Sequence, residues 1–327
     1  MSASPKSLLE IDISKPRYDQ STYVGRAKHF LQVTNPLNVF ATSNALENAR
    51  SIVTKHRLKE PLPDGFTVDD LWSAKILYDS AFHPDTGEKM NIIGRMSAQV
   101  PMNMLITGGM MTFYKSTPAV VFWQWINQSF NALVNYTNRS GDAQLSNSHL
   151  LTSYAAATGG ALTTALGLNH LVKNASPIIG RLVPFVAVAA ANCVNIPLMR
   201  SQELMEGTPV YDENGNRLGL SKAAARDGII QVTFSRISMA APGMVLVPFV
   251  MNRLERQGTL RKVPWMTLPI QVSLVGFCLT FATPLACAVF KQKAEIKYTN
   301  IESELKEKLD QQFGDNPPNT LWYNKGL

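Results

Sequence analysis

The distribution of charge along the chain divides it into a polar beginning, an apolar middle and a polar end. Residues 263–290 form a run of 28 positions without Lys, Arg, Asp or Glu, and residues 143–172 form a run of 30. Two shorter uncharged runs cover residues 182–199 and 116–138. Because about 20 apolar helical residues cross the hydrocarbon core of a bilayer, these runs predict membrane-spanning helices.

We therefore expect an all-α, polytopic membrane protein with about five transmembrane helices. They are placed near residues 98–120, 149–171, 182–200, 229–252 and 266–290. A large soluble helical protein is the alternative, but residues 150–168 and 272–290 lack the polar face that a soluble helix carries. Residues 97–138 are long enough to cross once or twice, and Lys115 and Pro118 interrupt them.

Three regions follow from this pattern: residues 1–95 are water-exposed and helical, residues 96–290 form the transmembrane domain, and residues 291–327 form an amphipathic tail. In the first region Asn44 with Glu47, and Thr67 with Asp70, have capping-box spacing. Helical apolar stripes follow each pair, and Pro61, Pro63 and Gly65 separate the two helices. The first stripe consists of Leu46, Ala49 and Val53, and the second consists of Leu71, Ala74, Tyr78 and Phe82.

The tail repeats this signature. Thr299 with Glu302 predicts a third capping box, and the sequence Asn316-Pro317-Pro318 is expected to end the helix. Its apolar stripe consists of Ile301, Leu305, Leu309 and Phe313.

Charge at the ends of the spans does not orient the protein. With five spans, eight Lys and Arg residues fall on each side of the membrane, so the rule of positive loops favours neither orientation. An odd number of spans would place the two termini on opposite sides.

Composition narrows the function classes. The formal charge of +7 lies mostly in the flanks and loops, where it suits anionic lipid headgroups, and no arrangement indicates nucleic acid. The three cysteines lack CxxC spacing and fall in apolar runs, which is typical of packing residues. We find no nucleotide-binding, metal-binding or catalytic motif, and so predict neither an enzyme nor a cofactor or metal site.

The strongest chemical pattern is a row of amides. Gln124, Gln128, Asn131 and Asn135 recur at helical spacing with Asn127 beside them, so they share one face. Unpartnered amides in lipid cost several kcal/mol each, so this face must contact water, another helix or a polar solute. Two readings remain open: an amphipathic helix at the membrane interface, or the polar lining of a substrate path.

Other polar residues within the predicted spans are candidates for the same path. Arg236 lies inside span four if that span begins at Ile229, but at the interface if it begins at Ile237. Asn192, Asn195 and Pro197 indicate either a broken helix, such as transporters use at their substrate sites, or a simple kink. The same two readings apply to the prolines of spans four and five, which are Pro242, Pro248, Pro269 and Pro284.

A polar turn precedes the first span. It consists of His83, Pro84, Asp85, Thr86, Gly87, Glu88 and Lys89. Aspartic proteases need two Asp-Thr-Gly loops, and the chain has one, so a tight turn is the interpretation that the residues support.

These blocks carry a family resemblance. The turn with the following Arg95–Asn103 (RMSAQVPMN), and also FWQWINQSFN at Phe122–Asn131, resemble the sideroflexins. So do NYTNRSGD at Asn135–Asp142, ANCVNIPLMR at Ala191–Arg200 and DENGNRLG at Asp212–Gly219. The likeness covers nearly the whole chain, from Asp19 to the final Tyr323–Leu327.

The resemblance implies a multi-pass protein of the mitochondrial inner membrane that transports amino acids. The branch it is most similar to imports serine for one-carbon metabolism. The alternatives are a membrane scaffold or assembly factor that transports nothing, and a tricarboxylate carrier. A tricarboxylate would require clustered cations, and Arg236 is the one candidate well inside a predicted span. Protein partners, transport direction, coupling ion and oligomeric state do not follow from the sequence.

Overall fold

The computed structural model describes residues 8–63, 65–83, 86–137, 147–172, 176–314 and 316–326. Within them the protein is mainly helical, as predicted, and also contains a small sheet. The helices are α2 (Tyr23–Val33), α3 (Ser43–Arg57), α4 (Val68–Ala81), α5 (Gln99–Thr112), α6 (Thr117–Thr137), α7 (Asn147–Leu171), α8 (Pro177–Met199), α9 (Ser201–Glu206), α10 (Lys222–Ala241), α11 (Val247–Arg256), α12 (Thr259–Lys262), α13 (Thr267–Cys287) and α14 (Ser303–Phe313). The strands are β1 (Thr208–Tyr211), β2 (Arg217–Ser221), β3 (Lys293–Lys297) and β4 (Thr320–Asn324).

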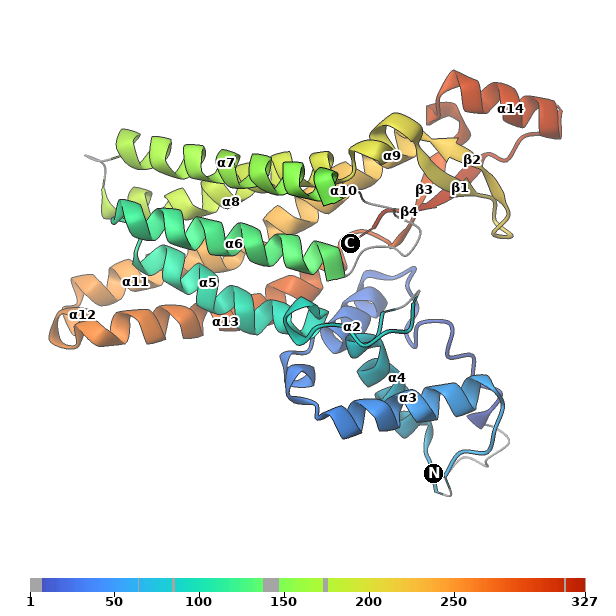
Figure 1. The fold of residues 1–327 in the computed structure, drawn as a ribbon, viewed down its shortest axis with the longest axis horizontal. Helices are drawn as coiled ribbons and strands as arrows, with labels where there is room; N and C mark the ends of the chain where they lie inside the picture. The colour runs from blue at the N-terminus through green and yellow to red at the C-terminus, as the bar shows by residue number, and fades with distance from the viewer. Residues whose placement is uncertain are drawn as a thin grey trace.

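The long helices α5, α6, α7, α8, α10, α11 and α13 lie alongside one another in an elongated bundle (Figure 1). Three helical stretches among the described residues are long and apolar enough to cross a membrane: Ile178–Met199, Lys222–Arg256 and Pro264–Cys287. The expected count of five is therefore not confirmed. Helices α6 and α7 are long enough, at 21 and 25 residues, but their polar side chains lower their hydropathy below that of the other three.

The predicted first span, residues 98–120, is two elements. Helix α5 ends at Thr112, and α6 begins at Thr117 with Pro118 in its first turn. The break falls at Phe113–Ser116, beside the Lys115 and Pro118 that interrupt the apolar run. At 14 residues α5 is about 21 Å long, shorter than a hydrocarbon core of about 30 Å.

Close helix contacts in the bundle depend on glycine. A Cβ added to Gly108 would lie 2.6 Å from Val272 of α13, and one added to Gly109 would lie 2.3 Å from the Trp123 indole of α6. This pair therefore lets α5 pack directly between α13 and α6. The central apolar core beside them includes Met110, Phe130 and Val275.

Both flanking regions lie at the same end of the bundle (Figure 1). Arg26 of α2 bonds to the carbonyl of Ala288 after α13, and Arg200 after α8 bonds to the carbonyl of Lys325. At the other end, Asn169 near the end of α7 bonds to the Tyr114 carbonyl before α6. The expectation of termini on opposite sides is therefore not supported: the bundle is traversed an even number of times between α5 and α13.

The N-terminal stripes pack as predicted. Leu46, Ala49 and Val53 of α3 are buried against Leu71 and the rest of the α4 stripe in one cluster. The Thr67–Asp70 capping box is present at α4, but the one predicted at Asn44 is wrong. The Thr42 hydroxyl caps α3 by accepting from the Ala45 amide at 3.2 Å, which leaves Asn44 inside the first turn.

The sheet was not predicted. Its four antiparallel strands have the order β2-β1-β4-β3, so the hairpin after α9 pairs with the last strand of the chain. Ile301, Leu305 and Leu309 of the predicted tail stripe are buried against it, whereas Phe313 is exposed. The tail helix ends at Gly314, with φ of +61°, before the prolines predicted to end it.

The predicted Thr299–Glu302 capping box is also wrong, because Glu302 caps a different helix. Its carboxylate accepts from the Lys222 amide at 2.8 Å and the Ser221 hydroxyl at 2.9 Å, at the start of α10. Burial acts to raise the pKa of Glu302, but these donors outweigh it and hold the pKa below 4.5. The tail is thereby tied to the longest helical stretch of the bundle.

We expect Glu302→Gln to destabilise the protein at pH 7 by about 1 kcal/mol, the usual cost of a weakened helix cap. A carboxyl whose pKa is lowered by folding stabilises above its unfolded pKa and loses this contribution as pH falls through its folded pKa. Thermal unfolding of both proteins in detergent should therefore differ at pH 7 and converge below about pH 4.5. A difference that is constant with pH would contradict the ionic cap.

Glycine packing predicts opposite outcomes for two substitutions. Gly109→Ala should destabilise by about 1–3 kcal/mol, because the rigid Trp123 ring occupies the position of the new methyl group. Gly167→Ala in α7 should be neutral or stabilise by up to about 1 kcal/mol, since nothing lies within 4 Å of its added Cβ and alanine favours helix. Denaturation midpoints of the two purified variants provide the comparison; equal effects would exclude the close α5–α6 contact.

The even number of traverses predicts sidedness. In a background without the three native cysteines, Ser51→Cys in α3 and Lys308→Cys in α14 should react with a membrane-impermeant maleimide from the same side. Gln257→Cys after α11 should react from the opposite side. Labelling in intact and in opened vesicles distinguishes the two sides, and reaction of positions 51 and 308 from opposite sides would refute this arrangement.

Candidate functional site

The amide face of α6 is directed into the protein. Gln124, Asn127 and Gln128 are 2%, 4% and 3% exposed, whereas Phe122 and Trp125 on the outer side are each 49% exposed. Asn131, farther along the helix, is half-buried, and the side chain of Asn135 lies outside the described residues. Burial of three amides between helices fits a polar lining within the bundle, and does not fit a helix that lies on the membrane surface.

Small residues on α7 form part of the opposing wall. Ser153, Ala157, Ala161 and Ala165 recur every fourth position, and all are at most 1% exposed. Ala165 packs with Val120 of α6 and Ala187 of α8, so the three helices meet at this level. Side chains of this size leave space in front of the amides of α6.

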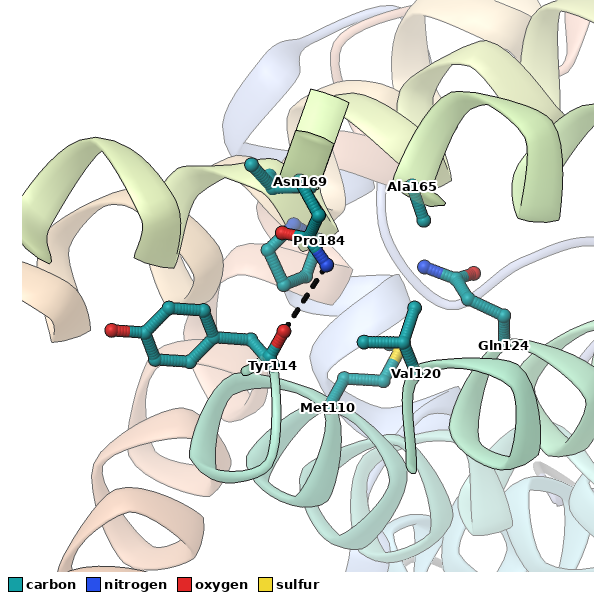
Figure 2. A pocket seen from close by; sticks show the side chains of 8 residues that line it. Met110, Tyr114, Val120, Gln124, Ala165, Asn169 and Pro184 are labelled. Carbon is teal, nitrogen blue, oxygen red and sulfur yellow. Dashed lines mark hydrogen bonds between the residues drawn. The ribbon is translucent and has the colours of Figure 1, made fainter. Parts of the chain in front are cut away.

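A cavity lies beside Gln124 (Figure 2). Its lining residues are Met110, Tyr114, Val120, Gln124, Ala165, Asn169, Val183 and Pro184. The space measures about 230 Å³ including its open part, and the enclosed part has room for about one water molecule. Figure 2 shows the Gln124 amide extending toward Ala165, while the Asn169 amide donates to the Tyr114 carbonyl at 3.1 Å.

Several buried polar atoms of this region make no hydrogen bond within the part of the chain that the structure describes. They are Oε1 of Gln124, Nδ2 of Asn127 and Oγ1 of Thr158. A buried polar group without a partner costs about 1–3 kcal/mol, so such atoms in a native bundle call for a ligand, a water or a moving neighbour. On the amide face, Oε1 of Gln124 and Nδ2 of Asn127 are therefore available to a ligand.

The asparagines of α8 lie on a continuous helix. Asn195 is 6% exposed and Asn192 is half-buried, but α8 runs without a break through Pro184 and Pro197. The broken helix considered for residues 192–197 is therefore wrong, and the prolines are accommodated within the helix. Helix α13 is likewise continuous from Thr267 to Cys287, through Pro269 and Pro284.

The interruption in this part of the bundle falls between α10 and α11. Residues Pro242–Leu246 form a single π-helical stretch, η4, that begins at one of the predicted prolines. Single π-helical turns within α-helices are frequent at functional sites.

Arg236 is half-buried in α10, which begins at Lys222, earlier than either predicted start of span four. A second cation, Lys325 near the end of the chain, interacts electrostatically with Arg236, which the sequence analysis did not predict. Arg236 is therefore not the isolated cation that the sequence suggested.

The polar turn at residues 83–89 is a tight loop that docks on α3. The Gly87 amide donates to the His83 carbonyl at 2.9 Å, and Gly87 has φ of +67°, a conformation that favours glycine. Lys89 contacts Ser43 and Glu47 of α3. Pro84 and Asp85 lie outside the described residues, and the described part of the motif agrees with the predicted turn.

Sequence reasoning missed several polar side chains of the bundle. Tyr154 of α7 shares a 2.9 Å hydrogen bond with Ser129 of α6, and Gln99 at the start of α5 is buried with an unpartnered Nε2 among the described residues. Single polar residues in an apolar run carry no periodic signal, so only the packing of neighbouring helices identifies them. No group of three or more His, Cys, Asp or Glu suited to a metal ion occurs in the described ranges.

Comparison with known proteins covers nearly the whole chain. The family model described as Sideroflexins matches residues 12–327. The chain is 62% identical to Sideroflexin-1 of Sus scrofa and 61% identical to Sideroflexin-1 of Homo sapiens, each over 97% of this chain and 98% of the relative. It is 57% identical to Sideroflexin-3 of Mus musculus over 98% of both chains. No solved structure matches. Because the family model and the relatives extend over almost its entire length, the chain belongs to the sideroflexin family.

Proposed function

We propose that this protein is a multi-pass transporter of the mitochondrial inner membrane that carries serine and other small neutral amino acids. Membership of the sideroflexins supports a mitochondrial, transporter-type role, and the apolar helices support a membrane location. The choice of serine, and a role in supplying one-carbon metabolism, rest on the resemblance to the serine-importing branch.

The observation that carries the proposal is two buried amides of α6, Gln124 at the cavity and Asn127 three residues farther along the helix. Oε1 of Gln124 accepts hydrogen bonds and Nδ2 of Asn127 donates them, and neither atom has a partner among the described residues. The Gln124 oxygen can accept a hydrogen bond from a hydroxyl or ammonium group of the solute, and the Asn127 nitrogen can donate one to its carboxylate.

The charge of the lining favours a solute without net charge. The residues around the cavity are apolar or neutral polar, and their one ionisable side chain is Tyr114. A net charge in such a site would lack the counter-charge that burial demands, whereas a zwitterion brings its own. A neutral amino acid thus fits this lining better than a tricarboxylate does.

Transport also requires the cavity to change shape. Its enclosed part holds about one water molecule, so on this proposal the path has to open before a solute can pass. Pro184 of α8 lines the cavity, and the π-helical stretch at Pro242–Leu246 divides the neighbouring α10 and α11. At both places the regular pattern of backbone hydrogen bonds is already interrupted, so the helix can bend there at little cost.

Gln124→Leu is the decisive substitution. We expect serine uptake into liposomes containing only the purified protein to fall about tenfold, because one hydrogen bond to the solute is worth about 1.5 kcal/mol. The same change should leave the unfolding temperature equal or higher, since it removes a buried acceptor that lacks a partner. Radiolabelled uptake and thermal unfolding of the same preparation measure both effects.

Gln311→Leu is the matched control, because Gln311 is an exposed amide of α14 outside the bundle. It should not alter uptake. Normal uptake by Gln124→Leu would remove the amide-lining idea while leaving transport intact. Absence of uptake by the folded, inserted wild-type protein would instead favour the scaffold or assembly factor, and inhibition by citrate rather than alanine would favour a carboxylate carrier.

A further inference from the structure

The segment from α2 to the short helix η1 (Pro36–Phe40) carries large apolar side chains that no described residue covers. Val24 is 61% exposed, and Leu37 and Phe40 are 70% and 78% exposed. Tyr23 and Leu31 are exposed as well. We call these five residues the N-terminal apolar face. Proteins in water rarely keep so many large apolar side chains together at the surface, so this face requires an apolar neighbour.

The exposed side of α2 is opposite the side that packs on the bundle. Ala27 and Phe30 are buried against the end of α13. Val24 and Leu31, with the exposed Lys28 between them, recur at i, i+4 and i+7 and therefore share the outer side of the helix. Helix α2 is thus fixed to the bundle by one side and presents a mainly apolar second side to its surroundings.

This second side continues the apolar surface of a predicted membrane span. The Tyr23 hydroxyl donates to the Leu285 carbonyl in the last turns of α13 at 3.3 Å. Leu285 and, one turn before it, Phe281 are exposed on the stretch Pro264–Cys287, which is long and apolar enough to cross a membrane. Exposed apolar groups on such a span face lipid, so α2 begins where the lipid-facing surface of α13 ends.

The other half of the face is held at the same end of the bundle. Helix η1 packs against η3 (Met96–Ala98), which leads into α5. A Cβ added to Gly276 of α13 would lie 2.7 Å from Met104 of α5, and Gly108 of α5 meets Val272 of α13, so these two helices are antiparallel. Helix α5 therefore begins near the level at which α13 ends, and both halves of the face adjoin one boundary of the bundle.

The charge of the segment suits a phospholipid surface. Residues 20–46 contain no Asp or Glu, but they contain Arg26 and Lys28. Lys28 lies on the outer side of α2, and its ammonium is 5.7 Å from the centre of the Tyr18 ring. A lysine beside an apolar surface can place its aliphatic stem among lipid chains and its ammonium at the phosphates.

We propose that the N-terminal apolar face lies in the headgroup region of the leaflet at which α13 ends, so that α2 and η1 bind the phospholipid surface without crossing it. An amphipathic helix of this kind buries its apolar side at the boundary between headgroups and acyl chains. This placement revises the expectation that residues 1–95 are water-exposed throughout. It involves neither the cavity nor a solute, so it does not depend on serine transport.

The test places a fluorophore on the face in the full-length protein, reconstituted into vesicles of phosphatidylcholine and phosphatidylglycerol. In a background without the three native cysteines, Val24→Cys and Phe40→Cys each receive an environment-sensitive NBD group. Both positions should emit as in an apolar environment. A lipid with a nitroxide high on its acyl chain should quench both at least about twofold, because they lie at interfacial depth.

Ser51→Cys and Lys308→Cys are the matched controls, since these positions are exposed on α3 and α14, away from the proposed contact. Labels there should emit as in water and should not be quenched. Emission and quenching at positions 24 and 40 equal to those at position 51 would overturn the proposal. Apolar emission without quenching would overturn it too, because a second copy of the chain, and not lipid, would then cover the face.

Crosslinking of the wild-type protein tests the same contact without any variant. A phospholipid with a diazirine on its acyl chain should form adducts with residues 23–40 and none with residues 43–57 of α3. Mass spectrometry of the digested protein locates these adducts. Adducts confined to the helices of the bundle would contradict the proposed contact.

Discussion

A polar group inside an apolar helical bundle must find a partner, and this constraint determines what the bundle can do. Within the described residues it is met at Arg26, whose guanidinium donates hydrogen bonds to backbone carbonyls, and at Glu302, which caps α10. It is not met at Gln124 and Asn127, where buried amide atoms remain open. The places where the constraint is met hold the fold together, and those where it is not met are where a ligand has most to gain.

The sequence predicted those features that a single segment encodes by itself. The stripe of Leu71, Ala74 and Tyr78 has its apolar period and its capping box within fifteen residues, and both are present. The spacing of Gln124 and Gln128 likewise predicted that they share one face, but it left open whether this face lies at the membrane interface or inside the bundle, where the structure has it. Helix starts were less predictable: Thr42 and Asn44 are both good caps, and the local fit of the Ala45 amide selected Thr42.

Features that join distant segments were out of reach. Strands β1 and β4 are four and five residues long and pair across more than a hundred residues, so neither carries enough pattern to predict the sheet. Glu302 reads as the cap of its own helix, yet it caps α10, about 80 residues earlier. The bond from the Arg26 guanidinium to the Ala288 carbonyl is a further case, because it joins positions 262 residues apart and no local pattern indicates it. Gly109 gives no signal either, since its role depends on where Trp123 lies.

The amide face extends along α6 from the cavity toward the flanking regions. Gln124 lies at the cavity near the Tyr114 end, Asn127, Gln128 and Asn131 follow it along the helix, and Thr137 contacts Gly94 close to the flanking regions. On the proposed path, a solute that enters at the flanked end would pass neutral amides before it reaches the cavity. Neutral amides suit a zwitterion, because they can donate to its carboxylate and accept from its hydroxyl and ammonium groups. A solute with several negative charges would find no counter-charge among the residues that line the cavity, so the cavity itself would discriminate between the two classes of solute.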